Sequence, residues 1–166
     1  MAPALVHEVL QAELGSAAEQ FAEFSDAPMA AASIGQVHQA VLRDGRQVAV
    51  KIQYPGVAGA IREDLANTEL VATFLRFATS ASGIVFDPRT LARELTVRIG
   101  EEVDYQREAA TITAFGDLYR GHPFIRVPDV VPQASSDRVL TMTYLDGMDW
   151  AAAQHADQDL KNTWAE

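Results

Sequence analysis

The chain has 166 residues, which is enough for one domain of ordinary size and too few for two. Thirteen basic and 23 acidic residues give a net charge of −10, so the chain lacks the positive surface that nucleic-acid binding requires. It contains no cysteine, which excludes disulfides, iron–sulfur clusters, thiolate zinc sites and cysteine nucleophiles.

The N-terminal residues do not resemble a targeting signal. Residues 1–14 carry His7, Glu8 and Glu13 among their apolar positions, which excludes a signal peptide and a membrane span there. We therefore expect a cytoplasmic location, no transmembrane segment in this chain and no nucleic-acid partner.

Two helices and a hairpin are predicted in the first third of the chain. Apolar residues at helical spacing predict a helix over residues 3–14, with Gly15 as its end. Ser16 and Glu19 form a capping-box pattern, which predicts a second helix that carries Phe21 and Phe24. Asp44-Gly45 lies between two apolar runs, residues 36–42 and 46–53, and this pattern predicts a β-hairpin.

Helices dominate the middle of the chain. The Tyr54-Pro55-Gly56 sequence ends the second strand, and an amphipathic helix is predicted from there to about Ser80. Asp87-Pro88 is a strong start signal for a long helix that runs to about Tyr119, with an interruption at Gly100 left open.

A second strand pair and a final helix are predicted in the last third. Residues 130–131 and 138–145 read as strands that turn at Ser135-Ser136-Asp137, and Asp149 reads as the cap of a terminal helix. This order of elements predicts an α+β fold with an antiparallel sheet.

Lys51 ends a Val48-Ala49-Val50-Lys51 run, which matches the strand-borne lysine that contacts nucleotide phosphates in protein kinases. By itself, a lysine at the end of an alternating strand is more often an ordinary solvated side chain. Glu108 favours the phosphate-binding interpretation, because it lies on a later helix, where a kinase holds its lysine with a glutamate.

An alanine-rich segment, residues 30–38, precedes the second half of the predicted hairpin, where a kinase has its glycine-rich loop. Gly35 is its one glycine. An alanine run by itself would suit a helix, whereas the β-branched residues Ile34 and Val37 argue against a continuing one.

Four segments together carry a family resemblance: residues 28–38, 48–57, 102–109 and 139–147. They resemble the UbiB (AarF-type) family of atypical kinases over roughly residues 10–150. The resemblance implies an α+β, protein-kinase-like small lobe with an antiparallel sheet, a long helix and extra family-specific helices.

The resemblance also implies roles for particular residues. Catalytic roles fall to Lys51, which would contact the phosphates, to its partner Glu108, and to Glu102 and Asp104, which would restrict access of protein substrates. Met142 would line the adenine pocket, and backbone hydrogen bonds to adenine would come from Thr143, Tyr144 and Leu145. The alanine-rich loop over the phosphates would comprise Ala30, Ala31, Ala32, Ser33, Ile34, Gly35, Gln36 and Val37.

The carboxylates near residue 104 have two interpretations. On one ideal helix Glu101, Asp104 and Glu108 form an acidic stripe, whereas Glu102 points elsewhere unless the helix is broken. A solvated acidic face is one interpretation. Carboxylates gathered at Lys51 would instead favour a cation such as magnesium. We assign no metal ligand within the chain, because the resemblance puts most magnesium ligands in a large lobe.

The resemblance divides the chain into an N-terminal helical extension (1–26), a kinase-like small lobe (27–148) and the start of a truncated large lobe (149–166). It implies the ATP-binding part of a UbiB-type kinase or ATPase linked to ubiquinone metabolism, with a lipid or isoprenoid-quinone precursor as partner and peripheral membrane association of the parent. The family's Lys-x-Gly-Gln motif is missing, and Thr143 stands where glutamate is common. A non-catalytic nucleotide-binding or protein-interaction module is the alternative.

Overall fold

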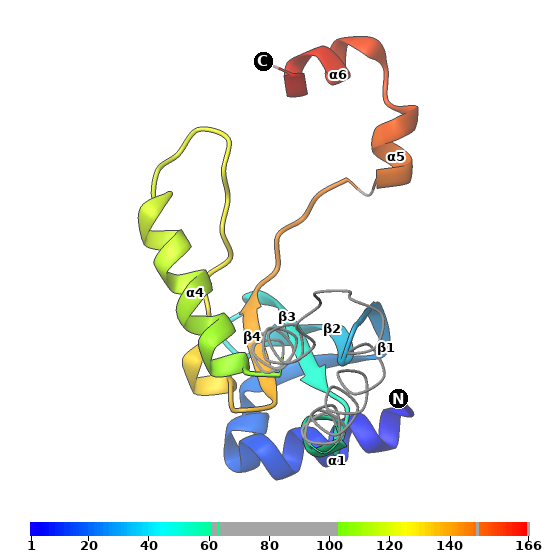
Figure 1. Ribbon diagram of the computed structural model, residues 1–166, viewed down its shortest axis with the longest axis vertical. Coiled ribbons are helices and arrows are strands. Elements are labelled where there is room, and N and C mark those ends of the chain that lie inside the picture. The colour runs from blue at the N-terminus through cyan, green and yellow to red at the C-terminus, as the bar shows by residue number, and fades with distance from the viewer. Residues whose placement is uncertain (61–62, 64–102, 149, 166) are drawn as a thin grey trace, which may run out of the picture.

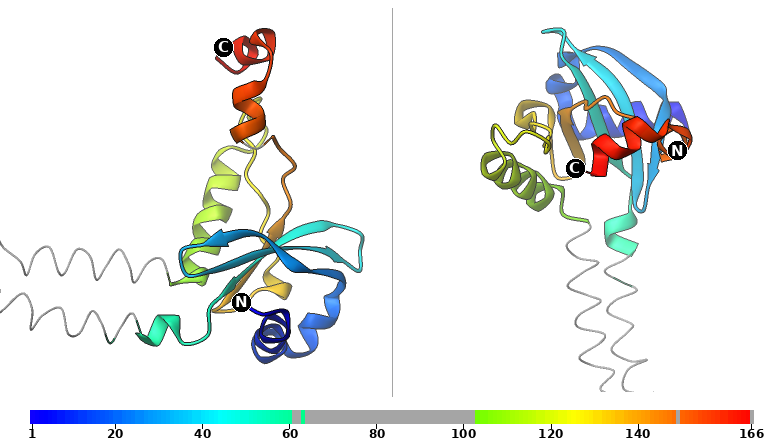
Figure 2. Two further views of the ribbon diagram at one scale, coloured as in Figure 1. Left: turned by 90° about the vertical axis from the view of Figure 1, so that its right-hand side faces the viewer. Right: turned by 90° about the horizontal axis from the view of Figure 1, so that it is seen from above.

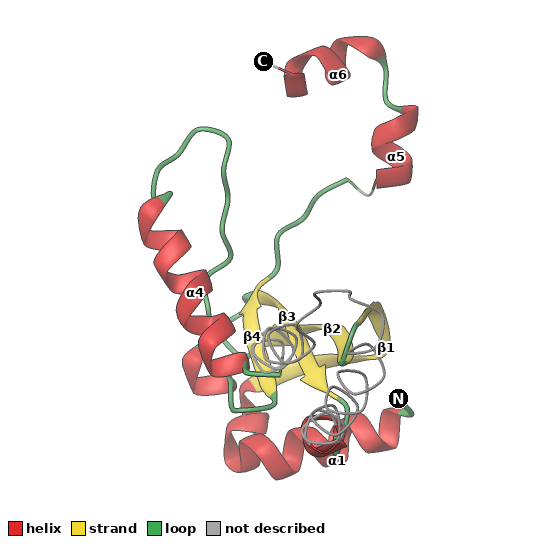
Figure 3. Cartoon of the chain, viewed as in Figure 1, coloured by secondary structure: helices red, strands yellow, loops and turns green. Residues whose placement is uncertain are grey.

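The computed structural model describes residues 1–60, 63, 103–148 and 150–165. Most of the predicted helix that ends near Ser80, and the first part of the predicted long helix, lie outside these residues. The elements are shown in Figures 1 and 3; they are α1 (Pro3–Leu14), η1 (Gly15–Gln20), β1 (Phe21–Ala32), β2 (Gly35–Leu42), β3 (Gln47–Gln53), α4 (Tyr105–Leu118), η2 (Pro132–Ala134), β4 (Val139–Thr143), α5 (Trp150–His155) and α6 (Gln158–Ala165).

The four strands form one antiparallel sheet in the order β1-β2-β3-β4. The predicted hairpin is confirmed: β2 and β3 are joined at Asp44-Gly45, where Gly45 has φ +87°. The Asp44 carboxylate accepts hydrogen bonds from the backbone N–H and the guanidinium of Arg46, which fixes the turn. The α+β prediction with an antiparallel sheet is therefore correct.

The residues of β3 alternate between the two faces of the sheet. Val48, Val50 and Ile52 are fully buried in a core with apolar residues of α1. Ala49 and Lys51 face the other side and are only partly buried. Figure 2 shows α1 against one face of the sheet, while α4 runs alongside β4. The alternating pattern of β3 thus separates a closed apolar face from one that is partly accessible.

The predicted second helix is wrong beyond Gln20. A 3₁₀ helix, η1, occupies residues 15–20 without a side-chain cap, and the chain then enters β1 at Phe21. Phe21 pairs with Leu42 of β2, and Phe24 stacks on the buried His38 ring at 5.2 Å between centroids. Both aromatic residues gain their packing from the sheet, so tertiary contacts override the local capping pattern.

The second predicted strand pair is confirmed only in part. Val130 forms a single antiparallel bridge with Met142, and the 3₁₀ helix η2 begins two residues later at Pro132. Proline cannot donate a hydrogen bond to a strand partner, so the ladder ends there. The main partner of β4 is instead β3.

The predicted terminal helix is two short helices, α5 and α6. Asp157 lies between them, and its carboxylate accepts a hydrogen bond from the Leu160 N–H, which caps α6. Asp149 lies outside the described residues. Both helices follow an extended segment after β4 that leads away from the sheet (Figure 1). Within the described part of the chain, no helix is long and apolar enough to cross a bilayer.

Gly35 begins β2 and pairs with Gln53 at the end of β3. A Cβ atom built on this glycine would lie 2.2 Å from the carbonyl oxygen of Ile52. Because that neighbour is backbone in a central strand, it cannot move aside without disturbing the sheet. The glycine is required for close strand packing at the start of β2.

Gly35→Ala should lower the free energy of unfolding by about 1–3 kcal/mol, the usual cost of overpacking. Gly147→Ala is the matched control, because a Cβ at that position meets no atom within 4 Å. Urea denaturation of the two variants measures the difference. Equal stabilities would show that the sheet has room for a Cβ atom at residue 35.

The turn at Asp44 has a pH signature. The hydrogen bond from the Arg46 guanidinium, helped by the Arg46 backbone N–H, holds the pKa of Asp44 below its usual value. The carboxylate therefore stabilises the fold above its unfolded-state pKa, and this contribution is lost as pH falls through the lower folded-state pKa.

Asp44→Asn keeps a residue that suits the turn but removes the charge. Urea denaturation at several pH values should find wild type more stable than this variant at neutral pH, with the difference vanishing in strong acid. A difference that does not change with pH would contradict the assigned ion pair.

Candidate functional site

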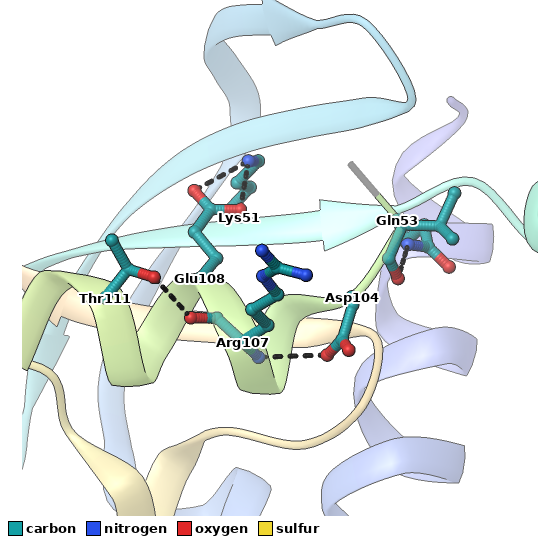
Figure 4. A network of polar contacts seen from close by, with 7 residues as sticks. Lys51, Gln53, Asp104, Arg107, Glu108 and Thr111 are labelled. Carbon is teal, nitrogen blue, oxygen red and sulfur yellow. Dashed lines mark hydrogen bonds and ion pairs between the residues drawn. The ribbon is translucent and has the colours of Figure 1, made fainter. Parts of the chain in front are cut away.

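The site is built around an ion pair between β3 and α4. The Lys51 Nζ donates to both carboxylate oxygens of Glu108, at 2.9 and 2.7 Å, across 57 positions of sequence (Figure 4). The Lys51 side chain is 19% exposed and that of Glu108 is 34% exposed. The pair predicted from the kinase-like run is therefore formed, and the ammonium group remains partly accessible.

The aromatic ring of Tyr105 also contacts the Lys51 ammonium group. The Lys51 Nζ lies 4.7 Å from the centroid of the Tyr105 ring, within the range of a cation–π contact. Tyr105 is only 1% exposed, and it belongs to a small core with Ile34, Val103 and Leu140. Sequence reasoning did not assign a role to this residue, although it lies three positions before Glu108 on the same helix.

Ala49 and Met142 lie on the same face of the sheet as Lys51. Ala49 is the cross-strand partner of Met142, and Lys51 is the partner of Leu140 on β4 and of Val37 on β2. Partners across an antiparallel pair point to the same face. Ala49 was not among the predicted site residues, yet its place two positions before Lys51 on an alternating strand could have identified it.

The alanine-rich segment forms the end of the β1–β2 hairpin. Ala30, Ala31 and Ala32 end β1, Ser33 and Ile34 make the turn, and residues 35–37 begin β2. The helical alternative for this segment is wrong, because the alanines pair with β2 instead. Since Val37 pairs with Lys51, the hairpin end lies beside the lysine.

The start of α4 is fixed by two polar contacts. The buried amide of Gln53 donates from Nε2 to the Val103 carbonyl oxygen at 3.1 Å, which ties the end of β3 to the chain just before α4. Asp104 has a non-helical backbone and its carboxylate accepts from the Arg107 N–H at 2.9 Å (Figure 4). Together they set where Glu108 emerges, one turn later.

The predicted acidic stripe is wrong at Asp104. The stripe assumed one continuous helix, whereas α4 begins at Tyr105 with Asp104 as its N-cap. The exposed Asp104 carboxylate is aimed at the helix N-terminus, while Glu108 binds Lys51. Glu102 and Gly100 lie outside the described residues. Among the residues the structure describes, no group of three His, Asp or Glu side chains could hold a metal ion.

Two backbone donors in the segment predicted to contact adenine already have partners. The Thr143 N–H donates to the Asp129 carbonyl and the Tyr144 N–H to that of Gln47. The Thr143 hydroxyl accepts from the Asp129 N–H, which anchors the preceding loop. Leu145 follows at an exposed position, where its N–H makes no backbone hydrogen bond to any described residue.

The N-cap assignment of Asp104 gives a clear expectation. Asp104→Ala should lower the free energy of unfolding by about 1 kcal/mol, the usual cost of losing an N-cap. Asp104→Asn should keep nearly full stability, because asparagine caps helices equally well. If thermal denaturation finds Asn as damaging as Ala, the negative charge rather than the cap is what the fold needs.

Comparison with known proteins identifies the family of the chain. The ABC1 atypical kinase-like domain family matches residues 1–163. "Atypical kinase COQ8B, mitochondrial" of Rattus norvegicus is 41% identical over 156 residues, covering 93% of this chain and 29% of that protein. "Probable protein kinase UbiB" of Cellvibrio japonicus is 34% identical over 157 residues, covering 92% of this chain and 28% of that protein.

A solved structure is also similar. The structure titled as the complex of Rv3197 and erythromycin from Mycobacterium tuberculosis aligns with a TM-score of 0.80 and 37% identity, covering 97% of this chain and 40% of that one. This chain thus spans less than a third of each curated relative named above. The resemblance in sequence and the kinase-like fold are both confirmed, and the chain belongs to the ABC1 atypical kinase-like domain family.

Proposed function

We propose that this chain is the nucleotide-binding small lobe of an atypical kinase, and that Lys51 binds the phosphates of ATP. The observation that carries the proposal is the position of Lys51. Its ammonium group is oriented by Glu108, partly accessible and next to the end of the β1–β2 hairpin. A fixed cation beside an exposed backbone hairpin suits an oligophosphate.

The residues around Lys51 fit a nucleotide. Ala49 and Met142 offer a partly buried, uncharged surface on the Lys51 face, which suits an adenine ring. The Leu145 N–H is our candidate donor to the adenine edge, because the N–H groups of Thr143 and Tyr144 bind within the protein. Of the backbone contacts predicted between residues 143–145 and adenine, this leaves the Leu145 N–H as donor and the backbone carbonyl oxygens as acceptors.

Magnesium would be held mainly by the nucleotide and by residues outside the described part. Within that part, Glu108 is engaged by Lys51 and Asp104 by the N-terminus of α4. When bound, the ion would neutralise phosphate charge during phosphoryl transfer. The described residues would not bind the ion themselves; they would orient Lys51 toward the phosphates.

The activity of the whole protein is a wider proposal. The named relatives are more than three times as long as the matched region, so a large lobe would supply the residues that handle the phosphoryl acceptor. We infer a small lobe that starts with β1, near residue 21 rather than 27, ends near residue 148 and leads into the large lobe at 149–166. The proposed acceptor is a lipid or isoprenoid-quinone precursor in ubiquinone metabolism, reached in the cytoplasm or at a membrane surface.

Nucleotide binding can be tested with the two lysines of the chain. ATP with magnesium at about ten times its Kd should stabilise the wild type by about 1.4 kcal/mol. Lys51→Ala should abolish this thermal shift and leave the fold intact. Lys161→Ala is the matched control, because the Lys161 Nζ lies on α6 and donates to the Gln154 carbonyl.

A shift that survives in Lys51→Ala would contradict the assigned phosphate contact. No shift in the wild type at millimolar ATP would contradict nucleotide binding by this chain. It would also favour the alternative of a protein-interaction module.

A further inference from the structure

We propose that Tyr105 is a positioning residue for Lys51: its buried ring holds the ammonium group in the binding geometry while phosphates compete with Glu108. This inference rests on the proposed function of Lys51. It adds a second support for the lysine, one that no anion can displace. The support comes from the first turn of α4, where Tyr105 precedes Glu108 by three positions.

The contact geometry is favourable. The Lys51 Nζ lies 4.7 Å from the centroid of the Tyr105 ring, and cation–π attraction acts within about 6 Å. Tyr105 is 1% exposed, so its ring is packed within the core beside the lysine. Because the contact is partly desolvated, it is stronger than the same pair would be in water.

The Tyr105 ring can hold Lys51 in place when phosphates displace the Glu108 carboxylate. Lys51 has three N–H donors, and the Glu108 carboxylate receives hydrogen bonds at both of its oxygens. Incoming phosphate oxygens compete with the carboxylate for these donors and also repel it. An uncharged ring attracts the cation in either state. It therefore keeps Lys51 in place as the lysine exchanges partners.

Tyr105 also connects the lysine to the alanine-rich hairpin. Ile34, a turn residue of that hairpin, belongs to the same buried core as Tyr105, together with Val103 and Leu140. The helix start that carries the ring is fixed by the Gln53 bond to Val103. The Tyr105 ring thus contacts Lys51 of β3 and lies in the core that joins the hairpin turn, β4 and α4.

The test uses nuclear magnetic resonance of the 166-residue chain labelled with ¹³C-lysine. Only two lysines contribute signals, and Lys161→Arg assigns that of Lys51. Without nucleotide, the ring current should move the Lys51 ε-methylene protons upfield in the wild type and in Tyr105→Phe, which keeps the ring. In Tyr105→Leu this shift should vanish and the side chain should become more mobile.

Affinity for magnesium ATP is the second readout. Tyr105→Phe should bind like the wild type, while Tyr105→Leu should bind about five- to thirtyfold more weakly, the range of a partly desolvated cation–π contact. If Tyr105→Leu fails to fold, 3,4,5-trifluorophenylalanine at position 105 preserves the size of the ring and weakens its attraction for cations. This variant should then show the added mobility and the loss of affinity.

The outcomes separate the two proposals. Wild-type ε-methylene shifts at random-coil values, or identical mobility and affinity across the series, would overturn the role of Tyr105. Nucleotide affinity that is unchanged by Lys51→Ala would instead overturn the role of Lys51, whatever the lysine spectra show.

Discussion

The ion pair between Lys51 and Glu108 joins the sheet to α4, and the rest of the site depends on it. Its two charges come from positions 57 residues apart, so each must be delivered by a rigid element. The central strand β3 holds Lys51, and the Gln53 bond to Val103 fixes where α4 begins. Because half-buried charges are costly when unpaired, the pair also discourages arrangements in which α4 moves away from the sheet.

The two faces of the sheet differ in burial: one is packed against α1, and the other is partly accessible. Val48, Val50 and Ile52 close one face against α1, and this apolar packing supplies stability without polar requirements. The opposite face carries Lys51, Ala49 and Met142, all partly accessible. Strand alternation places the buried residues and Ala49 and Lys51 at neighbouring positions of β3, and Met142 is the partner of Ala49 on β4. The buried face thereby holds the Lys51 face rigid, which the proposed nucleotide site requires.

Local signals and family motifs correctly predicted the hairpin at Asp44-Gly45 and the pairing of Lys51 with Glu108. They failed where distant contacts decide the outcome. The capping pattern at Ser16 suggested a helix, but pairing with β2 draws Phe21 and Phe24 into a strand. Helical periodicity likewise grouped Asp104 with Glu108, because a sequence pattern does not reveal that a helix starts anew between them. The contact between Lys51 and Tyr105 joins two elements whose packing only the fold defines.

The proposed nucleotide site lies on the Lys51 face of the sheet and not on the α1 face. Titration of the ¹⁵N-labelled chain with magnesium ATP, followed by amide chemical shifts, tests this most directly. The largest changes should fall on Gly35, Lys51 and Leu145, while Val6 and Leu10 of α1 stay unperturbed. Changes confined to α1 and its side of the sheet, or no change at saturating nucleotide, would contradict it.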